Sequence, residues 1–345
     1  MDTARWLDER AGRILERLRC PVCGEPLSET AAGTSRALRC PRRHSFDIAR
    51  QGYVNLLAGR APHVGDTAEM VAARADFQAA GHYDVISAAL AAAATEAAAR
   101  LGATAATRPA PAPPTLCSAY PHAPMSDQNR CVEVSRAKDT TAGVRAEPPA
   151  PDSGAYPLVV DVGAGTGRHL GAVLAALPDA VGLALDVSKP ALRRAARAHP
   201  RAAAALADTW QRLPLADAST AVLLNVFAPR NGPEFHRVLD PTGTLLVVTP
   251  AADHLAELVD ALDLLRVDPE KADRVAASLG GHFTPASSTV HRAELTLTRP
   301  EVATLVGMGP SAWHTDPGKL AERLAALPEP IRVTLAVHLD AHLPR

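Results

Sequence analysis

From residue 158 onward, short apolar runs alternate with longer segments in which apolar residues recur at helical spacing. The runs with the length and composition of buried strands are 158–162, 181–186, 202–206, 221–227 and 243–249. The segments between them predict helices ending near Leu177 and over 188–199, 233–239 and about 253–265. Strands separated by such helices form βαβ units on a parallel sheet. The pattern predicts a doubly wound α/β fold, with antiparallel edge strands near 288–298 and 331–339.

The first half of the chain is organised differently. A short helix is predicted over 5–18, and one or two helices over 66–101, with a break at Gly81. Ten prolines fall between Pro109 and Pro157, a density that forbids regular helix or strand and predicts disorder. We therefore divide the chain into an N-terminal module (1–62), a helical connector (63–102), a Pro/Ala-rich disordered insertion (103–157) and a larger domain (158–345).

Composition and charge narrow the class of protein. Apolar residues make up 47% of the 345, so the chain can bury substantial cores, and two domains are expected. The net charge is −1, so a nucleic acid would have to be held by a local basic patch, for which residues 1–60 offer eleven Arg against seven acidic residues. We see no stretch of roughly 20 apolar residues and no signal peptide, and expect a cytoplasmic protein without a membrane.

Cysteine and histidine spacing near the N-terminus predicts a metal site. Cys20 and Cys23 are separated by two residues, and Cys40 and His44 follow after a gap of sixteen. Four such ligands close a tetrahedron around zinc, which leaves no open position for activating water. We therefore predict a structural zinc site, which stabilises a module with little core of its own. Five cysteines, three of them in this pattern, argue against a disulfide framework.

A glycine-rich turn follows the first predicted strand of the larger domain. It runs from Asp161 through Gly163, Gly165 and Thr166 to Gly167, at the carboxyl edge of the sheet, where glycines let backbone approach a ligand. The pattern fits either a nicotinamide cofactor or S-adenosylmethionine.

Acidic residues after the strands favour S-adenosylmethionine. Asp161 before the first glycine suits the ammonium of the donor. Asp186 closes the next strand, where a carboxylate accepts ribose hydroxyls, and Asp208 follows the third strand, where the adenine amine commonly lies.

The segment after the fourth strand is a candidate substrate site. Asn225 and Phe227 stand where substrate meets the methyl group in such sheets, and could orient a planar base by hydrogen bonding and stacking. A plain strand-to-helix turn broken by Pro229 is the alternative. His254, after the fifth strand, reads on its own as a cap or surface residue.

Taken together, these residues resemble the bacterial 23S ribosomal RNA guanine-N1 methyltransferases, which join a zinc ribbon to a class I methyltransferase sheet. The matching stretches are Cys20–Cys23, Cys40–Leu57, Asp66, Met70–Arg74, Gly81–Tyr83, Asp161–Gly167, Asp186–Lys189, Phe227–Pro229 and Thr249–Leu255. The run from His44 to Leu57 is specific. Ala228–Asn231 and Asp253–Asp260 are similar to the actinomycete branch that confers macrolide resistance. The chain departs from the family pattern in its 103–157 insertion, where relatives have a short link.

The resemblance implies a zinc ion at the Cys3His site and S-adenosylmethionine bound with Tyr83, Gly165, Thr166 and His254. It also implies that the ribbon grips a 23S rRNA hairpin, with Arg42, Arg43 and Arg50 as phosphate contacts. A homodimer is compatible with the sequence. Two alternatives stay open: a small-molecule methyltransferase of antibiotic biosynthesis, and a non-catalytic RNA-binding assembly factor.

Overall fold

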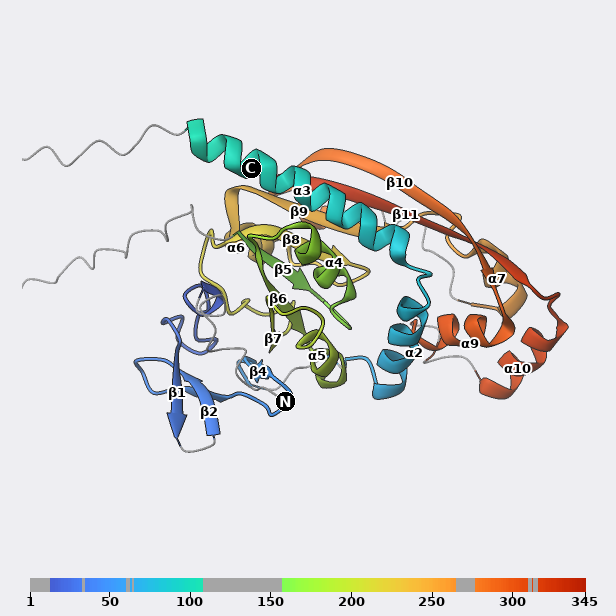
Figure 1. The fold of residues 1–345 in the computed structure, drawn as a ribbon, viewed down its shortest axis with the longest axis horizontal. Coiled ribbons are helices and arrows are strands. Elements are labelled where there is room, and N and C mark those ends of the chain that lie inside the picture. The colour runs from blue at the N-terminus through green and yellow to red at the C-terminus, as the bar shows by residue number, and fades with distance from the viewer. Residues whose placement is uncertain are drawn as a thin grey trace, which may run out of the picture.

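A small three-stranded sheet forms the N-terminal lobe of the protein (Figure 1). The computed structural model describes residues 13–32, 35–59, 63, 65–107, 157–264, 277–309, 312 and 316–345. The three antiparallel strands are β1 (Ser28–Ala32), β2 (Ser35–Arg39) and β3 (Ser45–Asp47). Most of the predicted 5–18 helix, and 108–156 of the predicted insertion, lie outside the described residues.

An eight-stranded sheet forms the centre of the larger lobe, in the order β10-β11-β9-β8-β5-β6-β7-β4. Its strands are β4 (Tyr53–Asn55), β5 (Leu158–Val162), β6 (Val181–Asp186), β7 (Ala202–Leu206), β8 (Thr220–Val226), β9 (Leu239–Pro250), β10 (Phe283–Leu297) and β11 (Ile331–Pro344). The strands from β4 to β9 are parallel where they pair, and β11 runs antiparallel to both of its neighbours. The doubly wound α/β fold and both antiparallel strands are confirmed.

Strand β4 joins the two lobes. It lies within residues 1–62 yet pairs with β7 in the large sheet, with Tyr53 opposite Ala204 and Asn55 opposite Leu206. The backbone N–H of Leu56 continues the pairing to the carbonyl of Leu206 (3.0 Å). The N-terminal module therefore supplies the edge strand of the larger domain.

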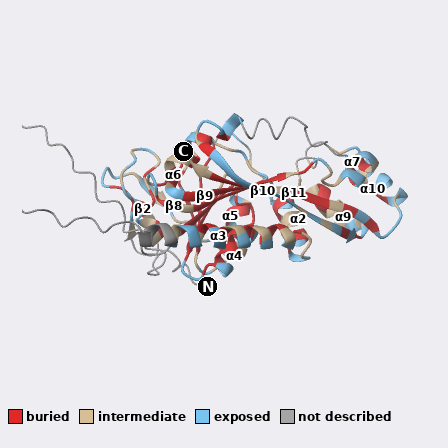
Figure 2. Cartoon of the chain, turned by 90° about the horizontal axis from the view of Figure 1, so that it is seen from above, coloured by how far each residue is buried: buried red, intermediate tan, exposed pale blue. Residues whose placement is uncertain are grey.

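Helices cover both faces of the large sheet, as Figures 1 and 2 show. The helices of this lobe are α2 (Ala68–Ala79), α3 (Asp84–Thr107), α4 (Arg168–Ala176), α5 (Lys189–Ala195), α6 (Gly232–Val238), α7 (Ala256–Leu262), α9 (Arg299–Gly307) and α10 (Pro317–Ala326), of which α2, α9 and α10 pack mainly on other helices. Alternate residues of a strand face opposite sides of a sheet. Accordingly, Val159 packs in a core with α3, α4 and α5, while Leu158 and Val160 pack in a second core with α6 and the small lobe.

The second core crosses the boundary between the lobes. Ile14, Leu18 and Leu38 of the small lobe are buried in the same cluster as Leu183 and Leu223 of the sheet. A bridge between Leu18 and Leu215 runs alongside these contacts. The two lobes thus share apolar packing as well as a strand.

The longest helix, α3, corrects our expectation about apolar stretches. Its first 19 residues, Asp84–Gly102, have a mean hydropathy of 1.3 and are long and apolar enough by those two measures to cross a membrane. Its many alanines give that value. In the structure its buried residues Ile86, Leu90, Ala94 and Ala97 pack in the main core, so the helix covers the sheet.

Candidate active site and metal centre

Four side chains of the small lobe converge on one point. The ligand atoms of Cys20, Cys23, Cys40 and His44 all lie within 4.8 Å of one another. Two tight turns bring them together: the Gly24 N–H donates to the Cys20 carbonyl (2.8 Å), and the Arg43 N–H to the Cys40 carbonyl (2.9 Å). The sequence thus predicted the members of this cluster correctly.

The distances within the cluster match a zinc tetrahedron. With Zn–S near 2.3 Å and Zn–N near 2.0 Å, a tetrahedron has S···S edges of about 3.8 Å and S···N edges of about 3.6 Å. Cys23 Sγ lies 3.7 Å from Cys40 Sγ, and His44 Nδ1 lies 3.6 Å from Cys20 Sγ and 3.3 Å from Cys40 Sγ. All four corners are protein atoms, so the geometry fits a closed structural site.

The glycine turn after β5 needs its glycines for two reasons. Gly163, Gly165 and Gly167 have φ of 80°, 53° and 77°, in the left-handed region that favours glycine. At Gly163, a Cβ would lie 2.4 Å from the Cβ of Ala228, in the loop after β8. The turn is therefore pressed against the neighbouring loop at the carboxyl edge of the sheet.

Asp161 is buried beneath this turn without a complete set of partners. Its side chain is 1% exposed, and its Oδ1 has no hydrogen-bond partner among the described residues. Burial, and then the nearby Asp186 charge, raise the pKa of Asp161 to about 8. An unpartnered carboxyl oxygen here suits the ammonium of an amino-acid ligand.

Asp186 and Asp208 lie at the ends of β6 and β7, as predicted. The two oxygens of Asp186 accept the backbone N–H groups of Gly165 (2.8 Å) and Ser188 (2.7 Å), while burial raises its pKa. The buried Asp208 accepts the N–H of Trp210 (3.0 Å) and lies 3.2 Å from His63 Nδ1. Both carboxylates thus hold loops of this edge in place and keep lone pairs for further donors.

Aromatic rings line the edge beyond the turn. Phe227 stands at φ 51° and is 40% exposed, with ring centroids 6.3 Å from Tyr83 and 6.1 Å from His254. A left-handed backbone at a bulky residue is strained, and such strain is typical of functional positions. The structure therefore brings together Phe227, Tyr83 and His254, which are far apart in the sequence.

Asn225 lies behind this group rather than on the rim. It is fully buried, and its Nδ2 donates to the carbonyls of Val162 (3.3 Å) and Pro229 (2.9 Å). Its side chain therefore ties the end of β5 to the loop that follows Phe227.

The helical connector folds over the glycine turn, which the sequence did not reveal. Thr166 Oγ1 donates to Gln78 Oε1 of α2 (2.6 Å). Arg74, also in α2, pairs with Asp66 and would lie 3.4 Å from a Cβ built at Gly165. Gln78 and Arg74 are polar residues on the inner side of α2, a signal we passed over because alanine-rich helices give little periodicity.

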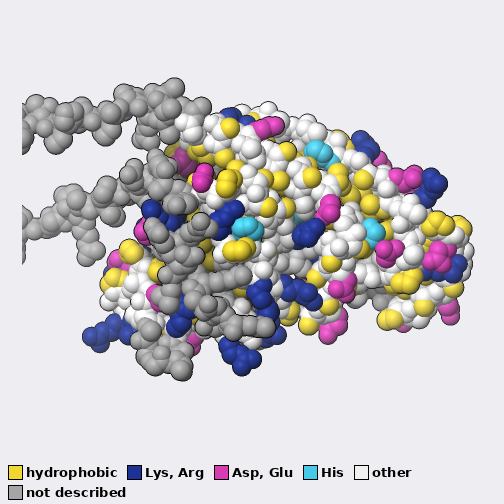
Figure 3. Space-filling view, in the orientation of Figure 1, with side chains coloured by type: hydrophobic (Ala, Val, Ile, Leu, Met, Phe, Trp, Pro, Cys, Tyr) yellow, Lys and Arg dark blue, Asp and Glu magenta, His cyan; other side chains and the backbone are white. Residues whose placement is uncertain are grey.

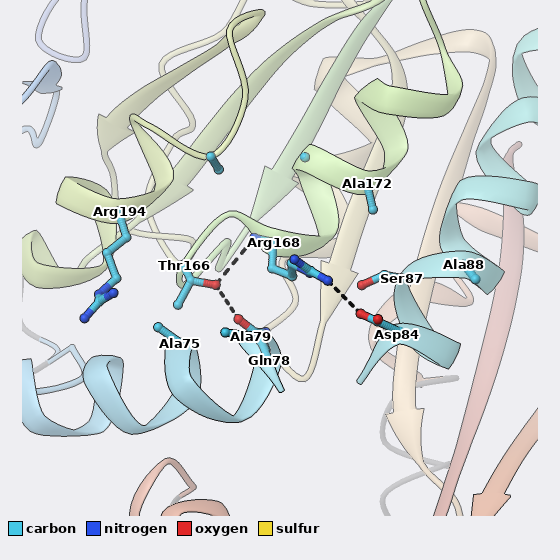
Figure 4. A pocket seen from close by; sticks show the side chains of 12 residues that line it. Ala75, Gln78, Ala79, Asp84, Ser87, Ala88, Thr166, Arg168, Ala172 and Arg194 are labelled. Carbon is cyan, nitrogen blue, oxygen red and sulfur yellow. Dashed lines mark hydrogen bonds and ion pairs between the residues drawn. The ribbon is translucent and has the colours of Figure 1, made fainter. Parts of the chain in front are cut away.

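A cleft of about 650 Å³ lies on the helical side of the turn (Figure 4). It is lined by residues of α2, α3, α4 and α5 around Thr166, and the Arg168–Asp84 ion pair (2.7 Å) crosses it. None of the acids Asp161, Asp186 and Asp208 and none of the rings of Phe227, Tyr83 and His254 is among its lining residues.

Comparison with known proteins decides the family. A family model for the N-terminal zinc ribbon of RlmA matches residues 18–61. A protein of Micromonospora griseorubida named as a 23S rRNA (guanine-N1)-methyltransferase is 62% identical over 332 residues, 96% of this chain and 98% of that relative. The chain belongs to the 23S rRNA (guanine-N1)-methyltransferase family.

Two further relatives span the same length. The 23S rRNA (guanine(748)-N1)-methyltransferase of Streptomyces fradiae is 44% identical over 94% of this chain and 95% of its own. The YxjB protein of Bacillus subtilis, named for the same class of reaction, is 25% identical over 93% of this chain and 94% of its own. Membership of this methyltransferase family confirms the enzymatic expectation, with its zinc ribbon and class I methyltransferase sheet, over both alternatives.

Proposed function

We propose that this methyltransferase modifies N1 of the single 23S rRNA guanine that corresponds to position 748 in the name of the Streptomyces fradiae relative, within a hairpin loop. The observation that carries the proposal is the exposed Phe227 ring, held at the carboxyl edge between Tyr83 and His254. A flipped base can stack on such a ring while its edge is read by hydrogen bonds.

The residues of the carboxyl edge would bind the methyl donor. Asp161 offers its unpartnered oxygen to the donor ammonium, Asp186 accepts ribose hydroxyls, and Asp208 accepts the adenine amine. The backbone of Gly163, Gly165, Thr166 and Gly167 forms the cradle, closed by Tyr83 and His254. S-adenosylmethionine, when bound, supplies the electrophilic methyl group.

The transfer requires one proton to leave the base. Guanine N1 carries a proton at neutral pH, so the N1–H bond breaks as the N1–CH3 bond forms, and S-adenosylhomocysteine leaves. Phe227 orients the base in line with the methyl group, and the open rim lets the proton pass to water. Asn225 acts as a positioning residue, because it fixes the loop that carries Phe227.

The zinc lobe would hold RNA and take no part in the chemistry, since its four ligand positions are filled. Exposed Arg42, Arg43 and Arg50 would contact phosphates of the hairpin. The site of action would be the cytoplasm, where ribosomal RNA is found, and the physiological output would be macrolide resistance. The homodimer stays a prediction, to be checked by light scattering.

Primer extension on 23S rRNA tests this proposal. A methyl group on N1 blocks base pairing, so reverse transcriptase should stop next to one loop guanine in RNA from cells that express the protein. RNA from cells that express the Phe227→Ala variant should show the stop at least tenfold more weakly. An equal stop in the two samples, or a stop at another nucleotide, would refute the assigned site.

A further inference from the structure

Helix α5 and the turn that follows it, which contains Arg197, present one exposed basic face, called the α5 face below. Between Val187 and Ala207 the chain holds one Lys and four Arg, but no Asp or Glu. Lys189, Arg193, Arg194 and Arg197 are exposed, and dark blue side chains gather where α5 lies (Figure 3). Among the described residues, no carboxylate pairs with Arg193, Arg194 or Arg197. In a protein of net charge −1, such a concentration of positive charge is local.

Arg201 shows what a structural arginine looks like in the same region. Its guanidinium donates to the carbonyls of Leu174, Leu177 and Ala180, which closes the C-terminal end of α4. Within the described parts of the chain, the side chains of Arg193 and Arg194 make no such bonds, and Arg197 makes one, from its Nε to the Arg193 carbonyl (2.9 Å). Arg194 in Figure 4 extends from α5 with no dashed contact to its neighbours. Folding of this helix therefore does not explain these three guanidinium groups.

The α5 face borders the zinc lobe. A Cβ built at Gly52, in the turn before β4, would lie 3.6 Å from the Cβ of Ala196, which is the C-cap residue of α5. Arg50 is exposed in that same turn, whose Gly52 N–H donates to the Ala49 carbonyl (2.8 Å). The pairing of β4 with β7 fixes the turn relative to the large sheet. Arg50 and the α5 arginines consequently belong to one surface that crosses the boundary between the lobes.

A groove runs between this face and α2. It has a volume of about 580 Å³ and is lined by Ala68 and Val71 of α2, together with Pro190, Arg193, Arg194 and Arg197. Three guanidinium groups along one groove suit successive phosphates, because each planar fork can bind two phosphate oxygens.

We propose that Arg193, Arg194 and Arg197, with Arg50, form an RNA-backbone surface that binds the phosphates of 23S rRNA flanking the target hairpin. The proposal rests on the proposed function, because it assumes that the substrate is structured RNA. Phosphate contacts of this kind position a nucleic acid without reading its sequence. The target loop would then be presented to the carboxyl edge by a grip on both lobes.

The test compares two double variants that each remove two charges. Arg193→Gln/Arg197→Gln alters the proposed surface. The control, Arg292→Gln/Arg332→Gln, removes two exposed arginines near the other end of the sheet, which pair with Asp253 and Glu294. The probe is a transcript of the 23S hairpin with its flanking helices, and binding is measured by filter retention over a range of salt concentrations.

We expect the α5 double variant to bind the transcript roughly tenfold more weakly near 0.1 M salt, with a slope of log K against log[salt] reduced by about 1.4 to 1.8. The control should match the wild type in both quantities. Unchanged affinity and slope in the α5 variant would overturn the proposal, as would an equal loss in the control. Phosphatidylglycerol vesicles serve as a second probe. An α5 variant that binds the transcript as the wild type does, but binds these vesicles more weakly, would also overturn the proposal and would indicate a lipid-binding surface.

The two proposals fail in different ways. RNA binding is measured without methyl transfer, so the α5 surface is judged even if primer extension shows no stop at the assigned guanine. Conversely, a methylated guanine in cells that express the α5 variant, with transcript binding equal to wild type, would keep the proposed function and reject this surface. Donor affinity, measured by calorimetry, should be equal in all three proteins and shows that each is folded.

Discussion

The zinc lobe and the carboxyl edge of the large sheet, called the donor edge below, each hold a turn in place, but by different means. In the zinc lobe, two turns are closed by hydrogen bonds, and four side chains meet at one point. At the donor edge, glycines, buried acids and a crossing helix hold the turn within a large core. The zinc lobe therefore depends on a metal ion, whereas the donor edge depends on packing.

Loss of one zinc ligand should have the largest effect. Cys40→Ser removes a corner of the tetrahedron. Structural zinc contributes about 10–16 kcal/mol in small domains, so we expect the small lobe to lose its zinc and its fold, and transcript binding to fall more than tenfold. Donor affinity should fall less than transcript binding, because the acids and glycines of the carboxyl edge lie in the larger lobe. Metal content by mass spectrometry, filter retention and calorimetry give the three values.

Cys117→Ser is the matched control, because the four ligands Cys20, Cys23, Cys40 and His44 remain, and it should keep one zinc per chain. If Cys40→Ser abolished donor binding as strongly as RNA binding, the two regions would not be stabilised independently.

Two glycines with the same backbone conformation compare the regions directly. Gly163 (φ 80°) and Gly24 (φ 76°) both have left-handed backbones, but a Cβ at Gly24 meets nothing within 4 Å. Gly24→Ala should therefore cost only the backbone strain, about 1–2 kcal/mol. Gly163→Ala adds a clash with Ala228 and should cost about 2–5 kcal/mol, with loss of donor binding. Urea unfolding with saturating zinc measures both; equal costs would mean that the two loops are equally free to move apart.

The pH dependence of the free energy of unfolding should reveal the raised pKa of Asp161. Its pKa of about 8 in the folded protein lies above its ordinary 3.8, so between these pH values the folded state keeps a proton that the unfolded chain has lost. Stability should consequently fall as pH rises from about 4 to 8, by at most about 1.4 kcal/mol per pH unit. Asp161→Asn should flatten this slope, and Asp179→Asn, at an exposed site, should not.

Binding of the methyl donor should remove the proton from the Asp161 carboxyl. A cationic ligand next to Asp161 favours the ionised carboxyl, so binding should release a proton and tighten as pH rises toward 8. Calorimetry in buffers with different ionisation enthalpies would detect the release. Binding without proton release would show that the ammonium does not meet Asp161.

The smallest expected effect concerns the strand that the lobes share. Val54 of β4 is fully buried, so Val54→Ala should destabilise the protein by about 2 kcal/mol. Val22→Ala, at a side chain that is 57% exposed in the zinc lobe, should change stability by less than about 0.5 kcal/mol. Thermal unfolding followed by circular dichroism distinguishes them, and similar melting temperatures would argue against tight coupling through β4.

Local patterns revealed most of the fold because each of the strands from β5 to β9 contains a short, mostly apolar run, and helices separate most of these runs. The zinc ligands could be found from spacing alone, since each pair lies within one turn. Non-local features escaped this reasoning. Tyr53–Asn55 seemed part of the N-terminal module because its partner β7 lies about 150 residues further along the chain.

The site showed the same limit. Gly163, Asp186 and Asp208 were recognised from their places after strands, but no sequence pattern shows that Asn225 is fully buried. Trp210, 54% exposed beside Asp208 and 6.3 Å from the ring of His63, was overlooked because aromatic residues are rare here and carry no spacing signal. Helices α9 and α10 were also missed; α9 begins with a capping box at Thr298 and Glu301 that could have located it.

The shared strand also limits how such enzymes can be rebuilt. A cut after residue 62, at the end of the N-terminal module, would remove β4 and leave β7 with an unpaired row of backbone N–H and C=O groups, which favours aggregation. Any chimera that exchanges zinc lobes between relatives therefore has to keep residues 53–56 with the catalytic half. The two halves have separate chemistry, but because they share a strand they cannot be exchanged as independent domains.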